Sequence, residues 1–138
     1  MIETSGHSTL HVRLAGQPDE VPRVRQAVRD WLRSAGNRCD WFTAELLVTE
    51  LVTNALRHAL PPLEVRVRAL GTAGVRIEVF DAARDSLPSR DDSPLDADNG
   101  RGLEIIAALA SRWGTESASS GKLVWGFLEF CVVGNVCN

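Results

Sequence analysis

Three polar residues recur at every fourth position in the middle of the chain, at Glu50, Asn54 and His58. The segment that carries them has a helical pattern, so this spacing places the three side chains along one helix face. A carboxamide oxygen in that position can ligate a hydrated Mg²⁺. A carboxylate one turn earlier can accept the proton of an attacking hydroxyl group or water. The spacing therefore indicates nucleotide chemistry, although a solvated helix face explains E-x-x-x-N better if the motif stands alone.

Two further features can serve a nucleotide. Asp81 ends an alternating strand pattern. A carboxylate in this position can accept a hydrogen bond from the exocyclic amine of adenine. Gly100 and Gly102 precede an apolar helix pattern that starts at Leu103. Because glycine has no side chain, the backbone there can come close to a phosphate group, and the start of the helix supplies N–H donors. Arg101 can add a phosphate contact. A simple turn or a loop-shaping glycine pair explains each feature alone, but their combined order favours a nucleotide site.

The residue patterns predict the elements that must position these side chains. Alternating apolar and polar residues indicate strands over 9–14, 63–70, 75–80, 113–118 and 122–133. Apolar residues at helical spacing indicate helices over 20–35, 41–59 and 103–112. Asp19 and Asp40 are expected to cap the first two helices. This order predicts an α+β fold, a two-layer α/β sandwich whose mixed, mainly antiparallel sheet has its helices on one face.

The length of 138 residues fits a single domain over 1–138, with a core at about 9–133. Residues 82–99 are polar and aperiodic, which predicts a functional lid. The net charge of −3 and the absence of a dominant basic patch argue against direct nucleic-acid binding. No apolar run reaches the length of a membrane span, and the N-terminus lacks the pattern of a signal peptide. We therefore expect a cytoplasmic protein without a membrane partner.

The three cysteines, Cys39, Cys131 and Cys137, are odd in number and lack metal-ligand spacing. They are expected to be reduced thiols, and no zinc site is expected.

The order of the motifs resembles that of the Bergerat-type ATPases, which include gyrase, histidine kinases and a heat-shock chaperone. Within this superfamily of histidine-kinase-like ATPases, the chain is similar to the anti-sigma-factor serine/threonine kinases. The similarity covers roughly residues 9–130 and rests on four stretches: Glu50-Leu-Val-Thr-Asn-Ala-Leu-Arg-His-Ala59, Gly102-Leu-Glu-Ile-Ile106, Arg112-Trp-Gly114 and Gly121-Lys-Leu-Val-Trp125. The resemblance implies the Bergerat ATP-binding fold.

The resemblance also implies a role for each motif residue. Glu50 would be the general base that activates a serine or threonine of a partner, and Asn54 would bind the metal Mg²⁺. Asp81 would recognise adenine. The phosphates of ATP would be bordered by Gly100, Arg101, Gly102 and Leu103. His58 would touch the nucleotide or the lid, although a helix-end histidine bonded to a carbonyl is an equal alternative.

The implied function is that of an ATP-dependent serine/threonine protein kinase with ATP and Mg²⁺ as cofactors. Such kinases phosphorylate a small anti-anti-sigma protein and sequester a sigma factor, so they regulate transcription by partner switching, usually as homodimers. Two alternatives stay open. The chain could be a non-enzymatic or weakly nucleotide-binding regulatory module of the same fold, or an ATPase without a protein substrate.

The chain departs from the family pattern at several positions, and two of these departures, the altered glycine box and the acidic segment, favour the non-enzymatic module. The family's Asp-x-Gly-x-Gly box is replaced by a sequence with Ala83 at its first glycine. Lys122 and Leu123 stand where a threonine often supports adenine, and Lys122 is expected to be a charge at a strand tip. Residues 82–99 hold five aspartates and two arginines, a net charge of −3 that is unfavourable beside a triphosphate unless Mg²⁺ or a basic partner compensates.

Overall fold

The computed structural model describes residues 2–5, 9–34, 40–58, 61–81, 97–118 and 121–130. The three cysteines, Ala83 and most of the predicted lid, residues 82–96, lie outside the described residues.

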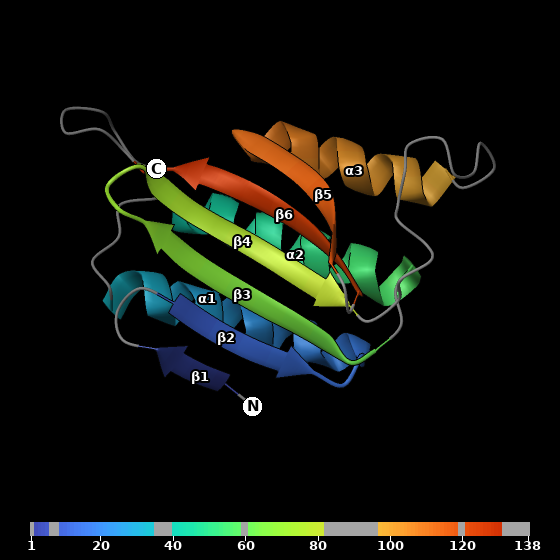
Figure 1. The fold of residues 1–138 in the computed structure, drawn as a ribbon, viewed down its shortest axis with the longest axis horizontal. Coiled ribbons are helices and arrows are strands. Elements are labelled where there is room, and N and C mark those ends of the chain that lie inside the picture. The colour runs from blue at the N-terminus through green and yellow to red at the C-terminus, as the bar shows by residue number, and fades with distance from the viewer. Residues whose placement is uncertain are drawn as a thin grey trace.

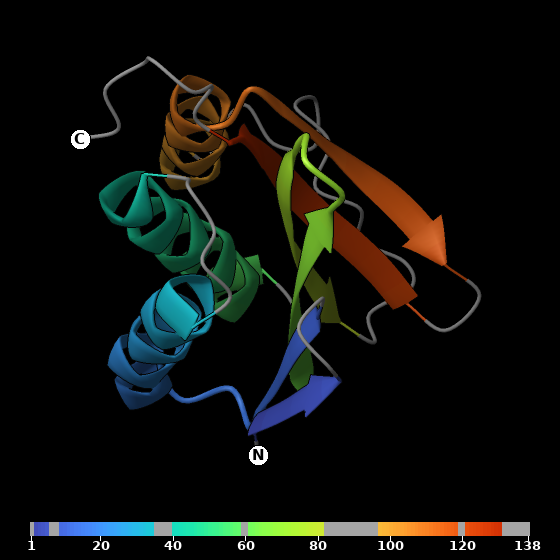
Figure 2. The same ribbon diagram turned by 90° about the vertical axis from the view of Figure 1, so that its left-hand side faces the viewer.

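A single sheet of six strands forms one layer of the described part of the chain, and three α-helices form the other (Figures 1 and 2). The strand order is β1-β2-β3-β4-β6-β5, and every described pairing is antiparallel. The strands are β1 (Ile2–Ser5), β2 (Thr9–Leu14), β3 (Leu63–Leu70), β4 (Gly74–Asp81), β5 (Arg112–Ala118) and β6 (Gly121–Glu129). The helices are the 3₁₀ turn η1 (Pro18–Glu20), α1 (Val21–Ser34), α2 (Trp41–His58) and α3 (Ala97–Leu109). Because all three α-helices cover the same face, the predicted two-layer α+β sandwich is confirmed (Figure 2).

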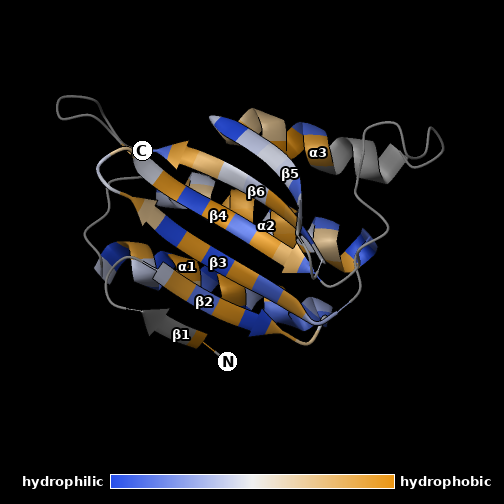
Figure 3. Ribbon diagram, in the orientation of Figure 1, coloured by the Kyte–Doolittle hydropathy of each residue, from blue (hydrophilic) through white to orange (hydrophobic). Residues whose placement is uncertain are grey.

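The central strands alternate between the core and the outer face of the sheet (Figure 3). In β3, for example, Leu63, Val65 and Val67 are buried toward the helices, while the intervening residues are charged. Charged residues pair on the outer face, where Glu78 of β4 lies 3.1 Å from Arg68 on the neighbouring strand β3 and 3.1 Å from Arg76 on its own strand. This alternation is what the sequence predicts for a sheet with one dry face.

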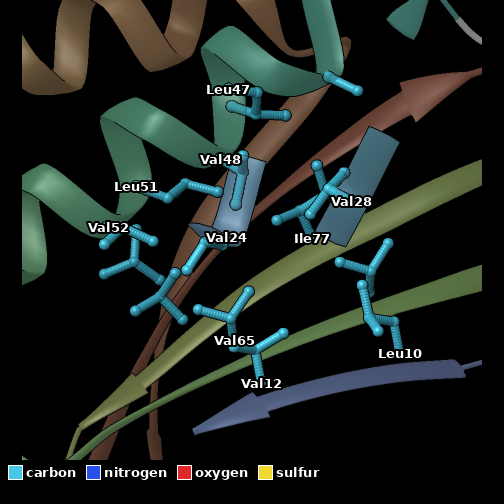
Figure 4. Packing of buried hydrophobic residues seen from close by; sticks show 14 of the residues in the cluster. Leu10, Val12, Val24, Val28, Leu47, Val48, Leu51, Val52, Val65 and Ile77 are labelled. Atoms are coloured by element: carbon cyan, nitrogen blue, oxygen red, sulfur yellow. The ribbon is translucent and has the colours of Figure 1, made fainter. Parts of the chain in front are cut away.

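The core lies between α2, α1 and the sheet. Figure 4 shows Leu47, Val48, Leu51 and Val52 pointing from α2 toward the strands, where Ile77 is one of the residues they meet. Leu47 is fully buried and packs directly over Gly126 of β6. No helix in the described part of the chain is both long and apolar enough to cross a membrane.

Asp40 caps α2, as predicted. Its Oδ1 accepts hydrogen bonds from the backbone N–H groups of Phe42 and Thr43, at 3.0 and 3.3 Å. Its Oδ2 accepts a bond of 2.6 Å from the hydroxyl group of Thr43. These bonds satisfy N–H donors that have no acceptor inside the helix, so the start of α2 is well defined.

The prediction that Asp19 caps the first helix is wrong. Asp19 lies inside η1, and Glu20 binds the preceding loop instead. The Glu20 carboxylate accepts hydrogen bonds from the backbone N–H groups of Ala15, Gly16 and Gln17, at 3.1, 2.9 and 2.7 Å. Gly16 has a φ of +106°, and a Cβ atom there would lie 2.7 Å from Cβ of Pro61. The longer glutamate side chain reaches back to a loop that this glycine allows to turn.

Other elements also differ from the prediction, and β6 ends at Glu129 instead of Val133. The chain pairs an additional strand, β1, onto the edge of the sheet, although four residues carry too short a pattern to indicate it. α3 begins at Ala97 instead of Leu103 and ends at Leu109.

Replacing Glu20 by Gln should make stability depend less on pH. Partial burial acts to raise the pKa of Glu20, but the three backbone N–H donors, together with Arg23, outweigh it and hold the pKa below its ordinary value. A carboxylate with a lowered folded pKa stabilises the protein above its unfolded pKa, and this contribution is lost as the pH falls through the folded value. Glu20→Gln should therefore be less stable than the wild type near pH 7, and the two should converge in acid.

Urea unfolding between about pH 3 and pH 7 tests this dependence. Glu104→Gln, which changes an exposed carboxylate on α3, is the control and should follow the wild type throughout. A stability difference for Glu20→Gln that stays constant with pH would contradict the role of the carboxylate.

The contact between Leu47 and Gly126 makes a second prediction. A Cβ atom at residue 126 would lie 3.0 and 3.1 Å from Cδ2 and Cδ1 of Leu47, so Gly126→Ala should overpack the interface and cost about 1–3 kcal/mol of unfolding free energy. Leu47→Ala should cost about 2–5 kcal/mol by leaving a cavity. Since the new methyl group fills part of that cavity, the double variant should lose less stability than the two single losses added together. Strictly additive losses in urea unfolding would show that the two residues do not share this contact.

Candidate functional site

The predicted polar residues of α2 lie in its second half. Glu50 and His58 are half-buried, and His58 is the last residue of the helix. Asn54 is 6% exposed. The four-residue spacing keeps the three side chains on adjoining turns, as the sequence predicts.

Asn54 is an exception in the buried face of α2. The other buried residues of this helix are all apolar: Ala44, Leu47, Val48, Leu51, Val52 and Ala55. Burying a carboxamide is unfavourable unless it forms polar contacts. Its oxygen is a suitable ligand for Mg²⁺, which commonly takes one or two protein ligands and completes its shell with phosphate oxygens and water. The position of Asn54 therefore fits a metal held jointly with a phosphate group.

A metal bound in this way does not need a cluster of protein ligands. Within the described ranges, no group of three or more His, Cys, Asp and Glu side chains is placed to hold a metal ion.

Asp81 ends β4 and is 3% exposed. Its register partner on β6 is Lys122, which is 2% exposed. Directly opposed residues share a face of the sheet, and the next pair on this face, Val79 and Val124, is buried. The Nζ atom of Lys122 lies 4.0 Å from Oδ2 of Asp81. Lys122 lies at the start of β6, as expected of a charge at a strand tip, but strand alternation directs its side chain into the layer between sheet and helices.

The predicted phosphate-binding residues lie inside α3, not ahead of it. Gly100, Arg101 and Gly102 belong to a helix that starts at Ala97. A glycine costs about 1 kcal/mol in a helix, which burial of Leu103 and Ile106 on the same helix can offset. Backbone N–H groups beyond the first turn donate to carbonyls within the helix, so the donors left for an anion belong to the turn that begins at Ala97.

Leu103 is 5% exposed and its side chain belongs to the hydrophobic core. It therefore anchors α3 against the rest of the protein. Any contact of this residue with a phosphate would have to come from its backbone.

The structure gathers these elements at one end of the molecule. The C-terminal half of α2, the end of β4 and the start of both α3 and β6 lie toward the same side in Figure 1. α2 packs against α3, β4 and β6. This end therefore combines a possible proton acceptor (Glu50), a possible metal ligand (Asn54), a buried carboxylate with a buried ammonium group, and a helix N-terminus. Together these groups can bind an anionic, metal-chelated ligand that carries hydrogen-bonding groups.

A separate cavity of about 390 Å³ opens on the outer face of the sheet. Arg66, Glu78, Phe80 and Leu123 are among the residues that line it. Their positions in β3, β4 and β6 direct them away from the helices, so this cavity is distinct from the end that holds Asp81.

The burial of Lys122 was not predicted from the sequence. The signal was present in two forms. Lys122 is the only lysine among fifteen basic residues, and it opens the last strand with the same spacing that buries Val124. What could not be read from the sequence is that the register sets it opposite Asp81.

Comparison with known proteins agrees with this fold. The family model described as "Histidine kinase-like ATPase domain" matches residues 14–125. Among solved structures, that of the RsbU and RsbW domains of Rv1364c from Mycobacterium tuberculosis is similar, with a TM-score of 0.65 and 22% sequence identity. The match covers 88% of this chain and 32% of that chain, and at this identity the likeness shows the fold. None of the curated proteins matches this chain.

Proposed function

Because the chain belongs to the histidine kinase-like ATPase domain family, we propose that it binds ATP with Mg²⁺ and phosphorylates a serine or threonine of a small anti-anti-sigma protein. In this proposal it also binds a sigma factor and regulates transcription by partner switching in the cytoplasm, as a homodimer. The family match over residues 14–125 carries the ATP-binding part, since that range includes Glu50, Asn54, Asp81 and α3. The anti-sigma part rests on the motif resemblance in the sequence.

Each residue has a task that suits its chemistry and its place. The Glu50 carboxylate would accept the proton of the attacking hydroxyl group, because it is half-buried one turn before the metal ligand. The Asn54 oxygen would ligate Mg²⁺, and the Asp81 carboxylate would accept a hydrogen bond from the exocyclic amine of adenine. His58 would contact the nucleotide from the end of α2.

The start of α3, with Gly100, Arg101 and Gly102, would border the phosphates. The partial positive charge of a helix N-terminus favours an anion there. Bound Mg–ATP would supply the transferable phosphoryl group and neutralise much of its own charge.

A second candidate is a non-enzymatic binding module that grips a sigma factor or another regulator. The sequence of residues 82–99 favours this candidate. The segment has a net charge of −3, and Ala83 replaces a glycine of the family pattern. Thermal unfolding with and without Mg–ATP separates the two candidates. A ligand at a hundred times its Kd adds about 2.7 kcal/mol of stability, so the kinase should melt at a higher temperature with millimolar Mg–ATP. The non-enzymatic module should not.

Replacing Glu50 by Gln should separate binding from phosphate transfer. The amide keeps the shape of the side chain but cannot accept the proton, so transfer should fall by about 10²–10⁴-fold while ATP affinity stays nearly unchanged. The measurement is transfer of label from γ-labelled ATP to proteins of a native lysate, with calorimetry for ATP binding.

Glu45→Gln is the matched control. Glu45 lies on the same helix and pairs with Arg29 at 2.9 Å, so its loss should leave transfer intact. Undiminished transfer by Glu50→Gln would remove Glu50 from the role of base. Release of phosphate without any labelled acceptor would instead identify an ATPase without a protein substrate.

A further inference from the structure

Exposed apolar side chains gather at the start of α2. Six large apolar residues are exposed in the described part of the chain, and three of them, Trp41, Phe42 and Leu46, lie within the first six residues of this helix. A single apolar residue on a surface needs no explanation, but a local group that includes aromatic rings is typical of a protein-binding surface. The start of α2 is therefore a candidate for such a surface.

Two of these residues lie in one row with the polar residues of the candidate site. The row follows α2 at four-residue spacing and consists of Phe42, Leu46, Glu50 and Asn54. The exposed fraction falls from 67% at Phe42 to 37% at Leu46, and it reaches 6% at Asn54. Because four residues make slightly more than one turn, the row winds from solvent toward the interior. Its open apolar part therefore leads to Glu50, which is half-buried.

The rise of an α-helix sets the distance between this apolar part and the proposed base. At about 1.5 Å per residue, Leu46 lies about 6 Å and Phe42 about 12 Å from Glu50 along the helix axis. A domain of about 100 residues has a radius of gyration of about 13 Å. A protein that brings a hydroxyl group to Glu50 thus has the size to contact both apolar residues at the same time.

The neighbouring helix adds positive charge beside the apolar group. α1 carries four arginines and one aspartate, a net charge of +3 in a chain whose total is −3. Arg29 is paired with Glu45 at 2.9 Å. Arg33 is exposed and instead contacts a neutral ring, since its guanidinium carbon lies 5.5 Å from the centre of the Trp41 ring. This edge of the apolar group therefore favours a carboxylate on a partner.

We propose that the start of α2 is the docking surface for the protein that accepts the phosphoryl group. Phe42 and Leu46 contact an apolar patch of the acceptor, and Arg33 pairs with a carboxylate at the margin of that patch. The serine or threonine of the acceptor then lies one to two turns further along α2, at Glu50. This inference rests on the proposed transfer to a protein, and it adds the chemistry of the acceptor: an apolar patch with an acidic margin, within about 12 Å of the phosphorylated hydroxyl group.

The docking surface acts on the affinity for the acceptor and leaves the chemical step to the site. In that step the hydroxyl oxygen bonds to the γ-phosphorus, the bond from this phosphorus to the β,γ-bridging oxygen breaks to leave ADP, and Glu50 takes the proton. Phe42, Leu46 and Arg33 touch none of these atoms in the proposal. Their loss should therefore raise the KM for the acceptor without changing the binding of ATP.

Phe42→Ser tests the apolar part of the surface. The probe is the band in a native lysate that the wild type labels from γ-labelled ATP and that Glu50→Gln does not. In a dilution series, Phe42→Ser should need about tenfold more lysate for half-maximal labelling, and its rate should approach that of the wild type at the highest concentration. Its Kd for Mg–ATP and its midpoint of urea unfolding should stay unchanged, because Phe42 is exposed and its backbone N–H still donates to Asp40. Leu70→Ser, at an exposed leucine that ends β3, is the control and should label like the wild type.

Arg33→Gln tests the acidic margin. A pair at the rim of an interface contributes little, so this variant should need about twofold to fivefold more lysate at low salt. Added salt should weaken labelling by the wild type more than labelling by Arg33→Gln, since the screened pair is already lost in the variant. Arg112→Gln is the matched control, because Arg112 lies over Phe127 on the outer face of the sheet. It should keep the salt dependence of the wild type.

The outcomes separate this inference from the proposed kinase activity. A wild type that labels no acceptor would overturn both. Labelling by Phe42→Ser at the lysate concentration of the wild type would overturn the docking surface alone. Sedimentation that shows Phe42→Ser as a monomer and the wild type as a dimer would assign the surface to a second copy of the chain. A clear fall in the midpoint of urea unfolding would mean that a segment of the chain itself covers Phe42, and either of these two results would also overturn the docking surface.

Discussion

Leu47 of α2 packs against Gly126 of β6, and the distance between that helix and the sheet depends on this contact. The leucine is fully buried, and its two Cδ atoms lie so near Gly126 that a Cβ atom added there would be only 3.0 and 3.1 Å away from them. A glycine at this point lets the helix lie close to the strands. Because Glu50 and Asn54 follow within two turns on the same helix, the apolar contact also helps to set how far this part of α2 lies from the sheet.

The polar groups buried in this layer are few and lie toward one end. Asn54, Asp81 and Lys122 are each less than 9% exposed, among neighbours that are almost all apolar. The other buried charge of the described residues, Glu78, faces the outer side of the sheet between Arg68 and Arg76. Glu78 is held by ion pairs with these two arginines. Asn54, Asp81 and Lys122 instead belong to the end of the molecule toward which the start of α3 also lies (Figure 1).

Local patterns predicted most of the fold because they depend on neighbours in the chain. Alternation predicted β2 and β3 to the residue, and Asp40 was identified as a cap because a short acidic side chain reaches the N–H groups of the next turn. The same reasoning failed at Asp19, because this residue lies inside η1 and Glu20 binds the N–H groups of the preceding loop instead. It also failed at α3, where two glycines were placed in the turn before the helix although they lie inside it, on a helix that buried apolar residues hold in place.

The spacing of Glu50 and Asn54 was set by the sequence alone, because helix periodicity places residues four apart on one face. The position of Asp81 at the end of a strand was also predicted from its neighbours in the chain, because the alternating pattern stops there. Its pairing with Lys122 was decided by the tertiary structure, since the register between β4 and β6 joins residues that are far apart in the chain. Alternation along one strand tells which residues share a face, but the partner across the sheet depends on how two distant segments are held together by the core.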